Sequence, residues 1–125
     1  MPNKVQRYRI TGTISAAGAF TATTNQPLHG RIKSIAINYP AATVALVLSS
    51  GDLVSQTILT LGAANTDITY YPRTPVCVNT GAETILYSTG NKVCTEYVVN
   101  SVLTLTASSG TAGQIVTMDV LVEEW

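Results

Sequence analysis

Apolar residues in this chain recur at every second position, and this alternation constrains the fold more than any other feature. It is clearest in residues 115–123, where Val116, Met118, Val120 and Val122 share one parity. Because successive side chains of a strand point to opposite faces, the pattern predicts a strand with one buried and one mostly solvated face. No segment keeps apolar residues at helical spacing over three turns. The sequence therefore predicts an all-β chain.

Further segments are rich in valine, isoleucine, threonine and tyrosine, the residues that favour strands. Turns with glycine separate them at intervals of about 8–12 residues, as in antiparallel sandwiches and barrels. We therefore predict that residues 1–125 form a single domain, an antiparallel β-sandwich (jelly-roll-like) or a closed barrel. The expected strands cover residues 5–13, 30–39, 44–48, 53–61, 84–87, 93–99, 101–107 and 115–123, with a short strand inside 15–27 and an extended stretch at 68–76.

For two segments, the residues also predict where each lies within the sheets. Residues 44–48 read Val-Ala-Leu-Val-Leu and are apolar at both parities, so we expect a central strand that is covered on both sides. Pro72 and Pro75 cannot donate to a ladder, and each pushes the residue before it into extended geometry. We therefore expect residues 68–76 to lie at a sheet edge or in a crossover.

The two cysteines, Cys77 and Cys94, indicate the redox compartment of the protein and are candidates for the hydrophobic core. Two cysteines are too few for a disulfide scaffold. The N-terminal residues lack the apolar stretch of a signal peptide, so we expect synthesis in a reducing cytoplasm, where pairing is disfavoured. Nothing approaches the roughly 18–20 apolar residues of a membrane span. Because isolated cysteines in β-rich segments are usually buried, we expect free thiols in the core.

Charged residues are only 11% of the chain, against about 25% in typical soluble domains, and their signs are segregated. Every charge before Asp52 is basic, and the charges near the C-terminus are all acidic. One interpretation is that the first and last strands lie side by side and neutralise each other. The other is that Lys4, Arg7 and Arg9 bind an acidic partner, with residues 1–9 as a docking arm. On a strand, Arg7 and Arg9 would form a basic stripe on one face.

The sequence offers no evident site for catalysis, a metal or a cofactor, so we expect a protein that is not an enzyme. His29 is the only histidine, and no cysteines or histidines have metal-ligand spacing. A serine–histidine–aspartate site that joins His29 to Asp52 or Asp67 stays open, because such triads follow no fixed order in sequence. The formal net charge of zero argues against direct binding of nucleic acid.

Carbohydrate binding also stays open, although aromatic residues are only 6% of the chain. Such sites usually present exposed aromatic platforms. Tyr70 and Tyr71 are adjacent, so on a strand they point to opposite faces and at most one of them is a platform.

Residues 56–76 combine three features in order: a threonine-rich strand end (Gln-Thr-Ile-Leu-Thr), an Asn-Thr-Asp turn, and a Tyr-Pro-Arg-Thr-Pro-Val crossover. The chain ends in Val-Leu-Val-Glu-Glu at residues 120–124. Together these features resemble small proteins encoded beside the head genes of tailed bacteriophages, with residues 30–124 covered. Those relatives often carry an aspartate-rich loop after the crossover, whereas residues 77–82 here read Cys-Val-Asn-Thr-Gly-Ala.

The resemblance implies a virion structural protein, first of all a capsid decoration (cement) protein on the outer surface of the head. It implies a small homo-oligomer, with a trimer as the first choice, that binds the major capsid protein. Such a protein is made in the host cytoplasm and ends on the capsid surface. A tail or baseplate structural protein and a host-glycan-binding module are the alternatives. The family has no catalytic residues to carry over.

Overall fold

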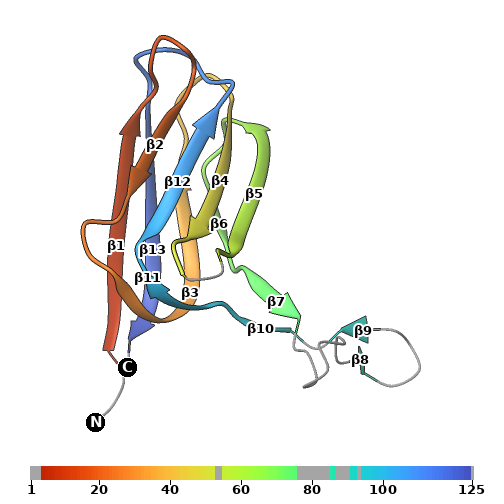
Figure 1. Ribbon diagram of the computed structural model, residues 1–125. Helices are drawn as coiled ribbons and strands as arrows, with labels where there is room; N and C mark the ends of the chain where they lie inside the picture. Colours follow the sequence, from red (N-terminus) through yellow and green to blue (C-terminus); the bar gives the residue numbers. More distant parts are fainter. Residues whose placement is uncertain (1–3, 53–54, 76–84, 87–90, 93, 125) are drawn as a thin grey trace.

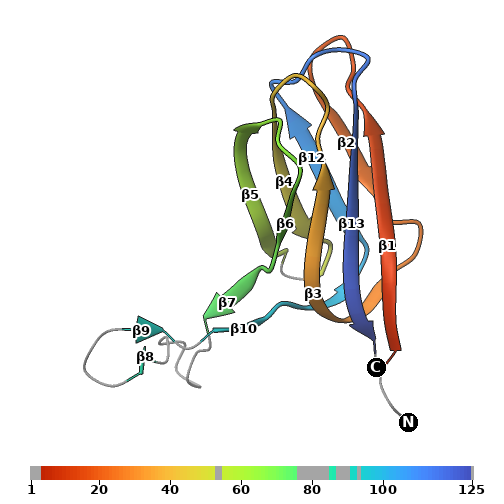
Figure 2. The same ribbon diagram turned by 180° about the vertical axis from the view of Figure 1, so that it is seen from behind.

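The protein is all-β, as the alternation predicted. The computed structural model describes residues 4–52, 55–75, 85–86, 91–92 and 94–124, and every regular element within them is a strand. Figure 1 and Figure 2 show two sheets packed face to face, with smaller ribbons that extend from one end. The described residues contain no helix that is long and apolar enough to cross a membrane.

The first sheet has five antiparallel strands, and β3 lies at its centre. Its order is β1-β13-β3, and the far edge of β3 is shared by β11, which pairs with residues 28–31, and β6, which pairs with residues 35–37. These strands are β1 (Lys4–Thr13), β3 (Leu28–Asn38), β6 (Ile68–Tyr70), β11 (Val98–Ser101) and β13 (Ile115–Glu124).

The second sheet has four antiparallel strands in the order β2-β12-β4-β5. None of these strands, all of which lie fully within the described residues, contains a charged side chain. They are β2 (Phe20–Thr23), β4 (Val44–Ser50), β5 (Thr57–Ala64) and β12 (Leu103–Ser108).

The pairings show how the chain is wound. β1 pairs with β13, β2 with β12, β3 with β6, and β4 with β5, so the chain forms one long antiparallel hairpin whose turn lies between β4 and β5. Rolling up this hairpin places successive pairs in alternate sheets. This is the winding of a jelly roll, so the structure is the sandwich of the two predicted architectures rather than the closed barrel.

Two small ribbons lie between β6 and β11 in the sequence. We call them the arm; they are distinct from the proposed docking arm of residues 1–9. In the arm β7 (Arg73–Pro75) pairs with β10 (Cys94–Glu96), and β8 (Ile85–Leu86) pairs with β9 (Asn91–Lys92). The arm leaves the sandwich at one end in both views (Figure 1, Figure 2). The extended stretch with the two prolines thus runs from a sheet edge into the arm, as its sequence predicted.

The base of the arm is attached to β3. Lys33 forms an ion pair with Glu96, with Nζ 2.9 Å from Oε2. Next to it, the backbone N–H of Ile32 donates to the carbonyl of Tyr97, at 2.9 Å. Because both contacts use β3, the arm begins and ends at the same edge of the five-stranded sheet.

The inward side chains of both sheets form one core. All four residues of β13 that the alternation placed on one face are fully buried, and so is Ile10 of β1, while Tyr8 packs at the margin of the core. Full burial of a leucine, isoleucine or valine contributes roughly 1.5–3 kcal/mol. The largest fully buried side chains are Ile10, Ile14, Leu28, Ile32, Ile35, Leu46, Leu48, Leu103, Leu105 and Met118.

Two strand predictions need correction. β4 does lie between two neighbours, but Ala45, Val47 and Ser49 on its outer face are only partly buried, so a second layer does not cover that face. Small apolar residues tolerate partial exposure, which is why apolar composition alone overestimates burial. Of the strand expected at residues 53–61, residues 53 and 54 lie outside the described residues, and β5 starts at Thr57; just before it the hydroxyl of Ser55 donates to the carbonyl of Ser50 at 2.8 Å.

The burial predicted for the cysteines is wrong for Cys94. This residue is an exposed free thiol in β10. The ribbon that contains it is a two-stranded sheet, and among the described residues no further strand pairs with it to build a core around the side chain. Cys77 lies outside the described residues, as do residues 1–3 of the proposed docking arm.

A close approach of backbones occurs at Gly30. This residue pairs with Glu124 of β13 on one side and Val99 of β11 on the other, just beyond a register shift between β3 and β13. A Cβ atom at Gly30 would lie 2.1 Å from the carbonyl oxygen of Glu123. The strand spacing at this point therefore requires glycine.

We predict that Gly30→Ala lowers the free energy of unfolding by about 1–3 kcal/mol, because the added methyl group forces β3 and β13 apart. Gly62→Ala in β5 is the matched control, since nothing lies within 4 Å of a Cβ built there. The control should stay within about 0.5 kcal/mol of the wild type. Urea unfolding followed by circular dichroism measures both, and equal stability of the two variants would contradict the close approach.

Candidate functional site

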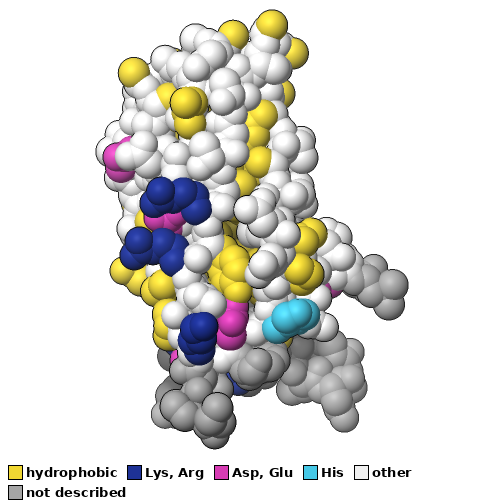
Figure 3. Space-filling view, turned by 90° about the vertical axis from the view of Figure 1, so that its left-hand side faces the viewer, with side chains coloured by type: hydrophobic (Ala, Val, Ile, Leu, Met, Phe, Trp, Pro, Cys, Tyr) yellow, Lys and Arg dark blue, Asp and Glu magenta, His cyan; other side chains and the backbone are white. Residues whose placement is uncertain are grey.

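The predicted partner-binding residues Lys4, Arg7 and Arg9 all lie on β1, at one edge of the five-stranded sheet. Arg7 and Arg9 are exposed, whereas Tyr8 and Ile10 between and after them turn toward the core. The orientation predicted for the basic stripe is therefore confirmed. Figure 3 shows basic side chains following this edge of the molecule, with acidic side chains between them.

Arg9 is paired with Asp119, the residue opposite it on β13. The contact is bidentate: Nε lies 2.8 Å from Oδ1, and Nη2 lies 3.1 Å from Oδ2. The hydrogen bonds and charge of Arg9, with a smaller contribution from the charge of Arg7, hold the pKa of Asp119 below its ordinary value although partial burial opposes this. The first and last strands thus lie side by side, as one interpretation of the charge segregation predicted.

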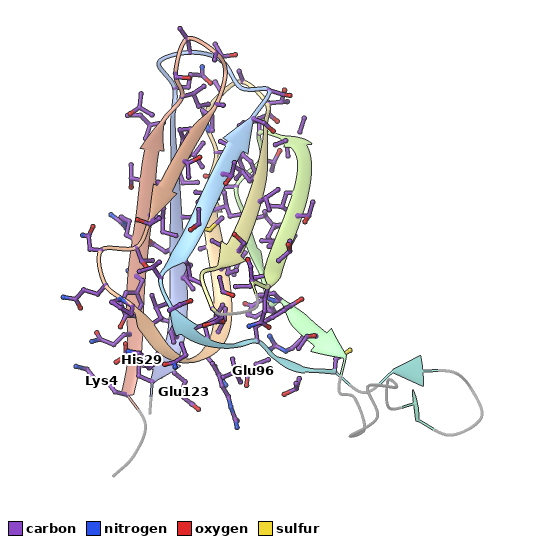
Figure 4. All side chains as sticks on the ribbon, viewed as in Figure 1. Lys4, His29, Glu96 and Glu123 are labelled. Atoms are coloured by element: carbon purple, nitrogen blue, oxygen red, sulfur yellow. The ribbon has the colours of Figure 1, made fainter. Side chains whose placement is uncertain are left out.

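Arg7 is placed differently from the other two basic residues. It lies opposite Leu121 and forms no hydrogen bond or ion pair with any residue that the structure describes. Its guanidinium therefore keeps its donors for another partner. Lys4 has the opposite parity to Arg7 and lies at the end of the sandwich that also holds His29 and Glu123 (Figure 4).

The outer face of the same sheet is hollowed beside the basic stripe. The depression is open and has a volume of about 670 Å³. Because the sheet order is β1-β13-β3-β6, four neighbouring strands and the turn before β6 contribute to it. Most of its side chains are polar or small: Arg9, Ala36, Asn38, Asp67, Thr69, Thr117 and Asp119, with Ile37 and Ile68 beside them.

Both carboxylates of this depression already hold neighbouring groups. Asp119 accepts from Arg9, as described above. Asp67 accepts from the backbone N–H of Tyr39 at 2.8 Å and from the side-chain amide of Asn38 at 3.1 Å. Asp67 thereby fixes the end of β3 against the turn that precedes β6. This depression could not be predicted from the sequence, because its residues come from strands that are distant in the chain.

His29 lies far from this depression. It is near the start of β3, while Asn38, which contacts Asp67, ends the strand, and nine strand residues span about 30 Å. The structure therefore does not bring His29 and Asp67 together, and a site that joins them is excluded. The side chain of His29 instead hydrogen-bonds through Nδ1 to the amide oxygen of Asn100.

Asp52, the other carboxylate that the sequence left open as a partner of His29, contacts a different atom of Asn100. Its carboxylate accepts from the backbone N–H of Asn100 at 3.2 Å and from the side-chain amide of Gln56 at 3.1 Å. His29 and Asp52 are thus brought to one neighbourhood, with Asn100 bonded to both. These contacts attach the turn between β4 and β5 to β11.

The environment of Asp52 lowers its pKa. Partial burial, the largest single influence, raises the pKa, but hydrogen bonds from Gln56, Ser50 and Ser101 and from the backbone of Asn100 together outweigh it. Sequence reasoning assigned Asp52 to a turn but missed these partners, since β11 lies 48 positions further along the chain. Within the described part of the chain, no cluster of three or more His, Cys, Asp or Glu side chains is placed to hold a metal ion.

Comparison with known proteins identifies no family. No family model matches the chain, and no curated protein matches it. Among solved structures, a chain from the structure of infectious bursal disease virus, Gx strain, aligns with 98% of this chain at 11% identity and a TM-score of 0.43. This chain spans about a third of the length of that one, since 34% of it is covered. So low a TM-score does not establish a shared fold.

We predict that Asp52→Asn lowers the melting temperature at about pH 7 and that this difference disappears toward about pH 2. The folded-state pKa of Asp52 is below the ordinary value of 3.8, so the ionised carboxylate stabilises the fold above that value. The stabilisation is lost as the pH falls through the lowered pKa. Melting curves of variant and wild type across this range measure the effect, and a difference that is independent of pH would contradict it.

Proposed function

We propose that this chain is a non-enzymatic virion structural protein, most specifically a capsid decoration (cement) protein on the outer surface of a tailed-phage head. The jelly-roll winding is the observation that carries the proposal, together with the resemblance of residues 56–76 to proteins encoded beside phage head genes. Jelly rolls recur in viral capsid and lectin domains. Because a fold alone does not define a function, this step is an analogy.

The distribution of charge supports an assembly role. Interfaces between subunits are depleted in charged residues, and the four-stranded sheet carries none on its strands. The proposed partners are further copies of this chain, as a small homo-oligomer, and the major capsid protein. The resemblance alone implies a trimer.

The proposed contact with the capsid is made by Arg7 and Arg9, with Lys4 beside them. Arg7 supports this role because it has no ion-pair partner among the described residues, and it follows Val5, which is 54% exposed on the same face. A basic stripe beside apolar surface fits an acidic partner with a partly apolar contact.

The location is tested on particles purified from the cultures in which the chain is made. Heads and tails are separated on a density gradient, and the chain is quantified in each by mass spectrometry relative to the major capsid protein. Recovery with heads, in a copy number comparable to the capsid protein, supports the proposal. Recovery with tails supports the tail or baseplate alternative, and absence from both overturns a virion role.

We predict that Arg7→Ala with Arg9→Ala leaves the fold intact but weakens attachment to the head, most clearly at low salt, with the difference from the wild type narrowing as salt rises. Exposed ion pairs contribute little to stability, whereas docking that depends on several charges is screened by salt. Arg31→Ala with Arg73→Ala removes the same charge from other exposed positions and serves as the control. Binding to stripped heads across a salt series measures the effect. Equal binding of both double variants would show that the basic stripe is not the contact.

A host-glycan-binding module is the second candidate, favoured by the depression on the five-stranded sheet. Asn38, Thr69 and Thr117 offer polar groups there. Tyr71 follows Thr69 by two residues and is 66% exposed, so it is the one of the tyrosine pair that faces solvent. A glycan array with Tyr71→Ala as the control decides this alternative, which fails if the wild type binds no glycan.

A further inference from the structure

The edges of the two sheets are not equally protected against pairing with another chain. Free backbone groups at a sheet edge are a template for a further strand, and natural proteins shorten or charge such edges. β2 has four residues and packs against β1, while β1 carries three basic side chains. β6 and β11, which share the remaining edge of the first sheet, have three and four residues. These three edges are therefore short or charged.

β5 is the exception. It has eight residues, Thr-Ile-Leu-Thr-Leu-Gly-Ala-Ala, with neither a charge nor a proline. It is the last strand of its sheet, and none of the strands that the structure describes pairs with its outer edge. Neither a short length nor a charge nor a proline protects this edge, although register shifts interrupt the pairing of β5 with β4 at two points.

Apolar side chains next to this edge are incompletely covered. Leu59 and Leu61 pair with the buried Leu48 and Leu46 of β4 and so face the core, yet both remain only partly buried. In the other sheet, β6 lies beside β5 in both views (Figure 1, Figure 2), and its Ile68 is 44% exposed. On one side of the sandwich the two sheets are joined by the packing of β1 against β2. On the other side, beside β5, apolar surface stays accessible.

We propose that the free edge of β5 pairs in antiparallel orientation with β5 of a second copy of this chain. A two-fold rotation brings the N–H and C=O groups of such an edge opposite their complements, so the edge is its own partner. No like charges meet, because neither β5 nor the rest of its sheet is charged, and the formal net charge of the chain is zero. The pairing joins two four-stranded sheets into one continuous sheet.

This contact deepens the proposed function, on whose homo-oligomer it rests, but it does not depend on where the protein acts. Because the pairing of β5 with β5 is two-fold symmetric, we expect a dimer or another even-numbered assembly in place of the trimer that the resemblance implied. Self-association is measured on the purified protein alone. Failure of this inference is therefore distinguishable from failure of the proposed capsid location, which is measured on particles.

The second sheet provides matched positions for the test, because two rows of residues cross it on the outer face. Thr57 and Thr60 of β5 lie in the same rows as Thr104 and Thr106 of β12 and, at the other edge, Thr23 and Thr21 of β2. The same pair of Thr→Lys substitutions can therefore be placed at the proposed edge, at the centre and at the opposite edge.

Light scattering at micromolar concentration should give the wild type twice the 13.2 kDa mass of one chain. Thr57→Lys with Thr60→Lys should raise the dissociation constant by about 100-fold, because like charges would face each other across the two-fold axis. Thr104→Lys with Thr106→Lys, and Thr21→Lys with Thr23→Lys, should leave the dimer intact. A monomeric or trimeric wild type would overturn the proposal, and so would dissociation by either control pair.

Hydrogen exchange on the wild type gives a second measurement that needs no variant. Pairing of β5 with a second copy protects its outward amides, so their protection should rise with protein concentration. Protection in β12, which is internal to the sheet, should not change with concentration. Exchange in β5 that is independent of concentration would contradict the contact.

Discussion

The antiparallel pairing of β1 with β13 is the interaction on which the rest of the structure depends. It runs over ten residue pairs and joins the two ends of the chain, as shown by Arg9 and Asp119, which lie 110 positions apart. Closing a loop of that length is costly in conformational entropy, and only a long ladder with a buried face offsets it. Once this pair exists, β3 can add to the free edge of β13. The inner faces of β1, β13 and β3 then contribute nine of the 19 buried hydrophobic residues among those that the structure describes.

Alternation was sufficient to predict the strands and their buried faces, because it depends only on local geometry. The buried residues of β13 and the orientation of Arg7 and Arg9 followed from it. Strand order did not, since it depends on pairings between distant segments. β11 occupies half of one edge of β3 and β6 the other half, and nothing local in either short strand specifies that division. The exposure of Cys94 on the arm could not be predicted from local sequence either.

The candidate site was predictable to the same degree. Segregation of charge between the two ends of the chain indicated a basic edge and an acidic neighbour, and the structure pairs Arg9 with Asp119 while Arg7 keeps its donors. The depression beside them was not predictable, because four strands and a turn must come together to form it. Asp52 and Asn100 illustrate the same limit, since a turn residue can be assigned from composition but its partner in another strand cannot.

The position of the arm has a consequence for how sequences of this kind can change. Its base is attached to β3 by the ion pair of Lys33 with Glu96 and by the hydrogen bond from Ile32 to Tyr97. None of the strand pairs of the rolled hairpin that the structure describes lies beyond that base. Residues can be gained or lost there without altering the register of any of the nine strands in the two sheets of the sandwich. Lineages that share the sandwich can therefore diverge in length at this point, and a foreign peptide inserted there would be carried outside the hydrophobic core.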